Sequence, residues 1–293
     1  MKNLSKAFSE GIRSGLKKAG LQFEELQSYA TPRRIAVTVI GLLDQQPDQV
    51  SERRGPSVSA AFDDQGEPTR AATGFAQSCK ISIDQLERLK TDKGEWLVFN
   101  SRTEGKQTET LLPGIVEQSL SDLPIPKRMR WGSSRHEFVR PVHWLVMLFG
   151  DKIVPCSLLG IESSNQTWGH RFHANHALTI TSAEQYADIL EQQGKVIPSF
   201  EQRQLKISAA IEAEAKRFDA TVVIDAGLLD EVTAMVEWPV ALSGNFSEQY
   251  LELPEEVLVC SMITHQKFFH MVNADGKMLP KFITVANIVS NDP

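Results

Sequence analysis

The sequence predicts an α+β protein in which mixed or antiparallel sheets pack against helices. Amphipathic segments of helical period alternate with short β-branched runs along the chain. Two apolar runs also flank Gly150-Asp151, a two-residue turn of the kind found in β-hairpins. We place a domain boundary in the irregular stretch 161–168, so that 1–165 is an N-terminal α+β region and 166–293 a second one; a single composite domain is the alternative.

Helix and strand signals alternate in the first half. A helix is predicted at 3–19, where apolar residues recur every four positions and Gly20 follows as a stop signal. The β-branched run at 32–43 predicts a strand. Gly55-Pro56 is a turn signal. Further helices are predicted at 69–79 and 106–121, and a strand at 95–101.

The second half opens with the strongest β-hairpin signal in the chain, which predicts two central, buried strands. A helix is predicted at 199–218, with Ser199 as N-cap and Gln202 placed for a capping box. The segment 226–237 has no clear period. The remaining elements are helices at 182–193 and near Pro254, and strands at 221–224, 239–242, 267–272 and 281–288.

Composition places the chain among ordinary globular proteins. Of its 293 residues, 41% are hydrophobic and 23% charged, with a formal net charge of −6. The sequence has no apolar run of about 18 residues and no signal-peptide region, so we expect a cytoplasmic protein without membrane contact. Cys79, Cys156 and Cys260 are odd in number and far apart, which argues against disulfides or a zinc site. Because the net charge repels a polyanion, nucleic-acid binding would require local basic patches.

The stretch 123–144 reverses the charge of the chain locally. Its five basic residues face a single acid, Glu137, and its three prolines restrict the backbone to rigid, extended conformations. Trp131 and Trp144 add flat apolar faces. Arginine pairs with phosphate and stacks on rings, so these residue types suit an anionic, base-bearing partner such as RNA. The alternative is a basic loop that pairs with acids elsewhere in the fold.

Other basic residues beside turns or strand ends could contact the same partner. Together they could form a positive stripe on an acidic body. Within the stretch, we expect Lys127 to Arg130 to be exposed and Arg140, at the entrance of the hairpin, to be paired inside the fold. The candidates for RNA binding are Arg33, Arg34, Arg53, Arg54, Lys127, Arg128, Arg130, Arg140, Arg171 and Lys267.

Three histidines recur at a spacing of three. His170, His173 and His176 could approach a metal from one face of a helix, because imidazole is a common metal ligand. No glutamate base of the HExxH type accompanies them. We therefore favour a polar loop in which His170 and Arg171 face a ligand or a carboxylate.

Two further groups have alternative interpretations. On a strand, His265, Lys267 and His270 would not converge, so we favour pairing of Lys267 with phosphate or carboxylate. Glu237 precedes Trp238, where burial could keep it protonated as an acid catalyst; the alternative is an ion pair or a hydrogen-bond acceptor at a strand start. The sequence contains no phosphate-binding loop and no nucleophile-elbow motif.

Ten blocks of this sequence together carry a resemblance to a known family. The blocks are ATPRRIAV (30–37), RRGPS (53–57), TDKGEWL (91–97), LPIPKRMRWG (123–132), FVRPVHWL (138–145), GHRF (169–172), VEWPV (236–240), LPEEVL (253–258), HQKFF (265–269) and LPKFITVANI (279–288). In the same order from one end of the chain to the other, they closely resemble the β subunit of bacterial glycyl-tRNA synthetase.

The resemblance implies a non-catalytic part of an aminoacylating enzyme. Enzymes of this family pair a small α subunit, which binds glycine, ATP and magnesium at a class II active site, with a large β subunit needed for tRNA recognition, in an α2β2 heterotetramer. This chain is then expected to hold no catalytic residue, metal or cofactor of its own. Region 166–293 is expected to be similar to the B3/B4 module of phenylalanyl-tRNA synthetase. The chain lacks the family's usual first strand and its long continuation, so we expect an N-terminal fragment.

The resemblance leaves three hypotheses for this chain. In the leading one, the chain binds RNA and docks its partner subunit, and the backbone of tRNA(Gly) is contacted by Lys127, Arg128, Arg130 and Arg140. In the second, the chain mainly docks the α subunit, with Trp131 as an interface anchor. The third is an editing-type hydrolytic site that would use His170 with Glu237.

Overall fold

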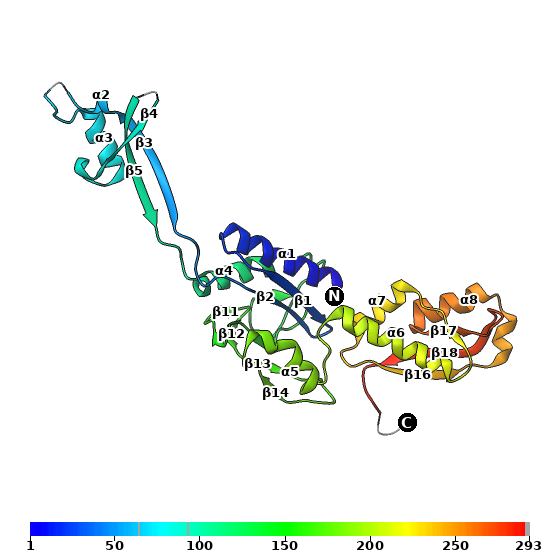
Figure 1. Ribbon diagram of the computed structural model, residues 1–293. Coiled ribbons are helices and arrows are strands. Elements are labelled where there is room, and N and C mark those ends of the chain that lie inside the picture. Colours follow the sequence, from blue (N-terminus) through cyan, green and yellow to red (C-terminus); the bar gives the residue numbers. More distant parts are fainter. Residues whose placement is uncertain (64, 93, 291–293) are drawn as a thin grey trace. The chain divides into compact units, whose positions relative to one another are not determined.

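The computed structural model describes residues 1–63, 65–92 and 94–290 (Figure 1). The fold class is α+β, as predicted, with helices packed on small, mostly antiparallel sheets. Contacts divide the chain into two compact units. The small unit comprises Ala19–Leu21 and Leu43–Thr108, and the main unit comprises Met1–Lys18, Gln22–Leu42 and the chain from Glu109 onward.

The small unit is a three-stranded antiparallel sheet with two short helices packed on it. The strand order is β3-β5-β4. Its core joins Ala61, Ala72 and Leu97 to the rings of Phe62 and Phe75. The elements are β3 (Gln49–Ser57), α2 (Val58–Ala61), α3 (Arg70–Cys79), the 3-10 turn Ile83–Gln85, β4 (Glu87–Thr91) and β5 (Gly94–Thr103).

The predicted turn at Gly55-Pro56 is wrong. β3 runs through both residues, and its pairing with β5 shifts register between Arg54 and Ser57, as at a β-bulge. Packing explains the glycine, because a Cβ at Gly55 would lie only 2.4 Å from the ring of Phe75. The glycine therefore lets α3 lie directly on the strand.

A β-hairpin in the main unit presents the first arginine pair. β1 (Glu25–Thr31) and β2 (Arg34–Ile40) are antiparallel, and their register ends at Thr31 opposite Arg34. Pro32 and Arg33 are therefore the two residues of the turn. The strand predicted at 32–43 is confirmed as β2, with Arg33 outside it and Arg34 as its first residue.

Two predicted helices pack closely in the same unit. α1 (Lys2–Lys18) buries Phe8, Ile12 and Leu16, as its period predicts. α4 (Thr108–Ser121) matches the helix predicted at 106–121. A Cβ at Gly15 would lie 2.5 Å from Cγ2 of Ile115, so glycine permits the close approach of α1 to α4.

Short strands fill the segment between α4 and α5 (Tyr186–Gln192). Gly150 has a φ of +61° and Phe149 pairs with Lys152, which confirms the hairpin. The prediction that both its strands are buried is wrong, because Ile153 is 43% exposed. The strands are β6 (Met129–Arg130), β7 (Glu137–Phe138), β8 (Leu145–Val146), β9 (Leu148–Phe149), β10 (Lys152–Ile153), β11 (Ser157–Leu158), β12 (Ile161–Ser164), β13 (Gln166–Trp168) and β14 (Ala177–Thr179).

The stretch 161–168 is not irregular. β12 and β13 occupy it, and β12 makes a parallel pair with β8 as well as an antiparallel pair with β11. The domain boundary placed in this stretch stays a prediction.

The C-terminal part of the main unit is a four-stranded antiparallel sheet of order β15-β17-β18-β16 with α6 packed on it (Figure 1). Its core includes Ile207, Ile211, Val232, Phe269 and Ile283. The elements are β15 (Thr221–Val222), α6 (Phe200–Lys216), α7 (Ala226–Met235), β16 (Val240–Asn245), the 3-10 helix Glu248–Glu252, α8 (Glu255–Cys260), the π-helix Ser261–Gln266, β17 (Phe269–Val272) and β18 (Met278–Ala286), and the 3-10 turn Ala183–Gln185 leads into α5.

Two helices of the main unit begin at side-chain caps. The Oγ of Ser199 accepts a 3.2 Å hydrogen bond from the backbone amide of Gln202 and caps α6, as predicted. The capping box is not formed, because the Gln202 side chain makes no return bond to the backbone of Ser199. Asp225 caps α7 in the same way, with a 2.7 Å bond from the amide of Leu228. The segment 226–237, left unassigned by its period, is thus mainly helical. Within the described residues, no helix is both long enough and apolar enough to cross a bilayer.

Candidate nucleic-acid interface

A buried carboxylate joins several of the sequence blocks. Glu237, only 1% exposed, forms an ion pair with Arg34, which is 7% exposed. The hydroxyl of Thr31 donates a 2.6 Å hydrogen bond to the same carboxylate, and Nη2 of Arg34 donates to the carbonyl of Trp168 at 2.6 Å. The ion-pair interpretation of Glu237 is therefore confirmed. Arg34 faces this buried pair and not solvent, which corrects its place among the candidates for RNA binding.

Neighbouring groups complete the buried network. The side-chain oxygen of Asn287 accepts hydrogen bonds from the amides of Glu237 and Trp238 at 2.7 and 3.1 Å. Arg203 is fully buried and donates to the carbonyls of Ile197 and Ala30 at 2.6 and 2.7 Å. Burial lowers the pKa of Arg203 to about 10.

Sequence reasoning missed Arg203. A signal was present, because Arg203 stands four residues before Ile207 and eight before Ile211, on the apolar face of α6. A basic residue on a buried helix face needs internal acceptors, which here are backbone carbonyls.

The three histidines do not converge on a metal. His170 is fully buried, and its Nδ1 accepts hydrogen bonds from the amides of Phe172 and His173 at 3.3 Å each. The ring of His173 stacks on that of His170 with centroids 4.7 Å apart, and its Nε2 accepts a 3.1 Å bond from the amide of Val289. Over the described part of the chain, no group of three His, Cys, Asp or Glu side chains is arranged to hold a metal ion.

The residues of the editing hypothesis are both enclosed. Glu237 is occupied by Arg34 and Thr31, and His170 lies at 0% exposure. Burial lowers the pKa of His170, while the Asn287 side chain and the Glu237 charge oppose this. A hydrolytic site requires access for substrate and water, so this geometry gives the editing hypothesis no support.

Above the buried pair, two guanidinium groups are exposed. Arg33 donates from Nη1 to the carbonyl of Gly169 at 3.4 Å, and its guanidinium lies 5.6 Å from the ring centroid of Trp144. Arg171 lies 5.8 Å from the ring of Phe172. Burial lowers the pKa of Arg33; the charge of Glu237 opposes this, and the charges of Arg34 and Arg171 add to it. Positive charge is therefore concentrated here.

The basic stretch forms a small hairpin of β6 and β7. Arg130 pairs with Glu137 at 2.6 Å, because β-sheet register places the two residues opposite each other. Arg128 donates to the carbonyl of Ser121 at 2.8 Å and remains exposed. Arg140 is exposed and, within the described residues, has no ion-pair partner. The expectation that Arg140 is paired inside the fold is therefore wrong. Arg130 is exposed as predicted, because its side chain remains 67% exposed despite the ion pair.

The remaining basic candidates have different surroundings. In the small unit, Arg53 donates to the carbonyl of Ser78 at 3.3 Å and Arg54 lies 4.0 Å from the ring centroid of Trp96; both are exposed. In the main unit, Lys267 pairs with Glu231 at 2.9 Å. The carboxylate interpretation of Lys267 is thus confirmed.

The strand predicted to begin at Lys267 starts two residues later. Lys267 has a φ of +60° and caps the π-helix, so β17 begins at Phe269. His270 is buried in β17, whereas His265 is exposed at the end of the π-helix. These residues do not form a common site.

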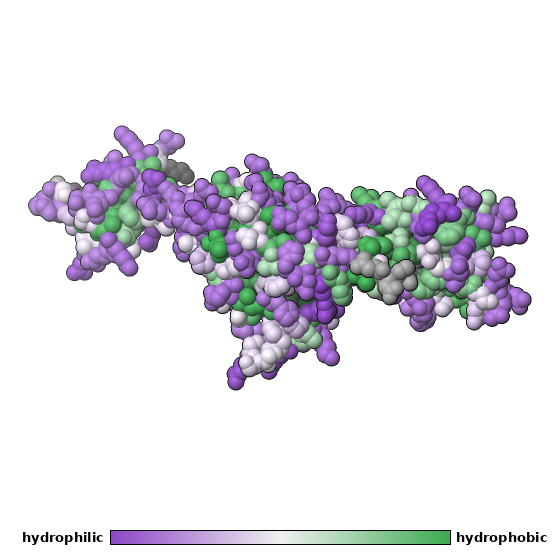
Figure 2. Space-filling view, turned by 90° about the horizontal axis from the view of Figure 1, so that it is seen from below, coloured by the Kyte–Doolittle hydropathy of each residue, from purple (hydrophilic) through white to green (hydrophobic). Residues whose placement is uncertain are grey.

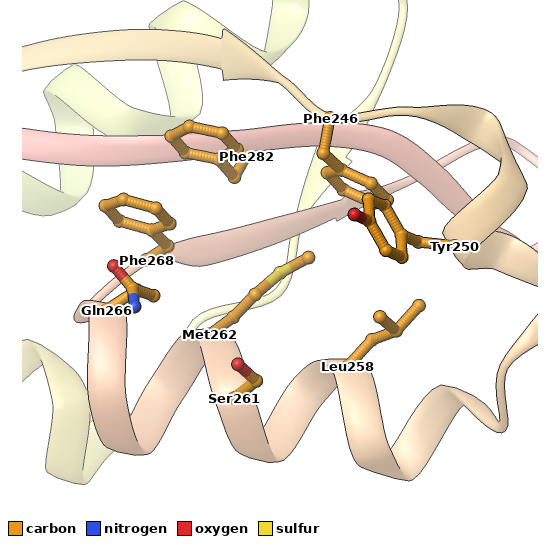
Figure 3. Close-up of a pocket in the computed structure, with 8 residues that line it drawn as sticks. All are labelled: Phe246, Tyr250, Leu258, Ser261, Met262, Gln266, Phe268 and Phe282. Carbon is orange, nitrogen blue, oxygen red and sulfur yellow. The ribbon is translucent and has the colours of Figure 1, made fainter.

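An apolar pocket of about 180 Å³ lies in the C-terminal part of the main unit. Figure 3 shows Leu258 and Met262 pointing from the helical segment toward Phe246 and Tyr250. No local pattern in the sequence indicates this pocket, because its walls come from separate segments between residues 246 and 282. Its lining residues are Phe246, Tyr250, Leu258, Ser261, Met262, Gln266, Phe268 and Phe282.

Comparisons with known proteins identify the family. The family described as "Glycyl-tRNA synthetase beta subunit" matches residues 1–293. The chain is 53% identical over 293 residues to the glycine–tRNA ligase beta subunit of Hahella chejuensis, and 51% identical over 294 residues to that of Marinobacter nauticus. The corresponding subunit of Citrobacter koseri is 45% identical over 293 residues. Each match covers all of this chain and 42% of the relative's length. The chain belongs to the glycyl-tRNA synthetase β-subunit family.

Proposed function

We propose that this chain supports ATP-dependent glycylation of tRNA by contacting the backbone of tRNA(Gly) through the basic stretch 123–144. The observation that carries the proposal is a set of exposed basic side chains in an acidic protein. Arg130 pairs with Glu137. The other four basic side chains of the stretch have no ion-pair partner among the described residues; they are Lys127, Arg128, Arg135 and Arg140.

Salt dependence of binding tests this proposal. Each phosphate contact adds about 0.7–0.9 to the slope of log K against log salt concentration. Replacing the four basic residues by glutamine should therefore weaken tRNA(Gly) binding and reduce the slope by about 3. A filter-binding titration at several salt concentrations measures both quantities.

The matched control removes the same charge elsewhere. Glutamine at four exposed lysines changes the net charge equally but leaves the basic stretch intact, so it should preserve most of the affinity. An equal loss of affinity in both variants would mean that only net charge matters and would reject the proposed contact. The control positions are Lys6, Lys17, Lys18 and Lys216.

A second candidate function is docking of the α subunit in an α2β2 assembly, in which α binds glycine, ATP and magnesium. Figure 2 shows hydrophobic residues gathered on the face of the C-terminal part of the main unit. In this part Tyr250, Leu253 and Val257 are 47%, 46% and 55% exposed, beside the apolar pocket. Such a surface favours a protein partner.

Co-purification separates the two candidate anchors for the α subunit. Trp131 is half-buried and lies in the basic stretch, away in sequence from the apolar surface. Loss of α from the complex with Trp131→Ala, while tRNA binding persists, would support the anchor proposed from sequence. Loss with Val257→Asp alone would favour the apolar surface.

We also propose that region 166–293 has the α+β fold of the B3/B4 module of phenylalanyl-tRNA synthetase. Support comes from the blocks PVALSGN and LPEEVL and from the antiparallel sheet β15-β17-β18-β16 with α6 packed on it. Superposition on an experimental structure of that module tests this proposal. A different strand order in the module would reject it.

A further inference from the structure

Arg33 and Arg171 form a second basic site, outside the stretch 123–144. The guanidinium of Arg33 lies close enough to Glu237, Arg34 and Arg171 to interact with the charge of each. Because Arg34 occupies that carboxylate in a buried ion pair, Arg33 and Arg171 keep exposed positive charge. Neither of these two has an ion-pair partner among the described residues. An anion between them would relieve their mutual repulsion.

An exposed aromatic ring adjoins these charges. Phe172 is 67% exposed, and the guanidinium of Arg171 lies 5.8 Å from its ring centroid. A second ring, that of Trp144, lies 5.6 Å from the guanidinium of Arg33. Bases of single-stranded RNA stack on such rings, while guanidinium groups bind phosphate through paired hydrogen bonds.

The loop that presents Phe172 is tightly held. His170 Nδ1 accepts hydrogen bonds from the amides of Phe172 and His173. The amide of Gly169 donates to the carbonyl of His176 at 3.1 Å, and a Cβ at Gly169 would lie 2.3 Å from the carbonyl oxygen of Ala174. The backbone that carries the exposed ring is therefore held in place by its own loop, which lowers the ordering entropy that binding a base would cost.

We propose that the turn of β1 and β2 and the loop 169–173 form a binding site for one unpaired nucleotide, whose base stacks on Phe172 while its phosphate binds Arg33 and Arg171. The site rests on the proposed tRNA-binding function and specifies which part of an RNA it accepts. A base inside a duplex has both faces stacked on its neighbours, so the site discriminates against double-stranded RNA.

Binding of short labelled RNAs to this chain tests the site. A single-stranded tetranucleotide should bind more tightly than a blunt duplex of the same sequence, as measured by fluorescence anisotropy. Phe172→Leu should lower the affinity for the tetranucleotide by about 5- to 150-fold, the range for loss of one base–aromatic stack. Phe172→Trp should keep the affinity of the unchanged chain, because it retains an aromatic ring. Arg33→Gln with Arg171→Gln should lower the salt slope by about 0.7, as expected for one phosphate of a single strand.

Matched controls keep this test separate from the stretch 123–144. Tyr250→Leu removes another exposed aromatic ring and should leave tetranucleotide affinity unchanged. The four-glutamine variant of the basic stretch should lower tRNA affinity yet retain the preference for single strands. Three results would each overturn the nucleotide site: equal binding of single strand and duplex, no binding of the tetranucleotide, or an unchanged affinity in a folded Phe172→Leu chain. An unchanged tRNA affinity in the four-glutamine variant would overturn only the proposed backbone contact.

Discussion

Replacing Glu237 by glutamine should destabilise the main unit strongly. The substitution keeps the size of the side chain and an oxygen that can still accept the hydrogen bond from Thr31. It removes the only negative charge that pairs with Arg34 among the described residues. Arg34 stays 7% exposed and cannot reach water without local opening. The cost is therefore that of an uncompensated buried charge.

The magnitude follows from the burial of both partners. Removing one member of a buried ion pair costs about 3–5 kcal/mol of unfolding free energy. With a urea dependence of about 2–3 kcal/mol per M, the unfolding midpoint should fall by about 1–2.5 M. By contrast, Glu231→Gln breaks the pair with Lys267, in which the carboxylate side chain is 50% exposed, and should cost no more than about 1 kcal/mol.

Urea unfolding followed by tryptophan fluorescence measures this difference, because four of the five tryptophans lie in the main unit. The double variant Arg34→Met/Glu237→Leu removes both charges and should recover much of the lost stability. If Glu237→Gln shifted the midpoint no more than Glu231→Gln does, the buried pair would not be a structural centre of this fold, and the reasoning would be refuted.

Three further predictions concern stability. Burial lowers the pKa of His170 and of His270 in the folded chain. As the pH falls below about 6.5, the ordinary histidine pKa, the unfolded chain therefore takes up these protons before the folded chain does. The free energy of unfolding should be highest above this pH and should decrease below it, which urea midpoints at several pH values would show. Gly55→Ala should cost about 1–3 kcal/mol in the small unit, because its Cβ would collide with Phe75, and hydrogen exchange of β3 would reveal the loosening. Ser199→Ala should cost about 1 kcal/mol through loss of the α6 cap, and an unchanged thermal midpoint would contradict this.

Local patterns predicted most of the helices correctly. The period of α1, the cap of α6 and the turn at Gly150 depend on residues close together in sequence, so each could be found without tertiary information. The helix α7 could not be predicted from its period, because apolar residues lie around much of its surface and remove the contrast between its faces. The turn prediction at Gly55-Pro56 is wrong because the glycine is required by its contact with Phe75, and turn rules consider only neighbouring residues in the sequence.

The candidate site depended more on long-range structure. Arg34 and Glu237 are 203 positions apart, so no spacing rule could pair them. The register of β6 and β7 places Arg130 opposite Glu137, a pairing that the charge pattern alone does not identify. Arg140, expected to be paired inside the fold, is exposed. Charge and aromatic content therefore located the basic regions, while only the fold determined which cations are paired and which are available.

Arg33 and Arg34 show how one turn separates two roles. Arg33 lies in the β1–β2 turn and is exposed. Arg34 is the first residue of β2 and belongs to the buried network. The buried pair of Arg34 with Glu237 fixes the hairpin. Since one carboxylate can neutralise only one guanidinium, Arg33 is left without a carboxylate partner among the described residues. The proposed nucleotide site depends on this division: because Glu237 engages Arg34, the charge of Arg33 would be left to bind phosphate beside Arg171.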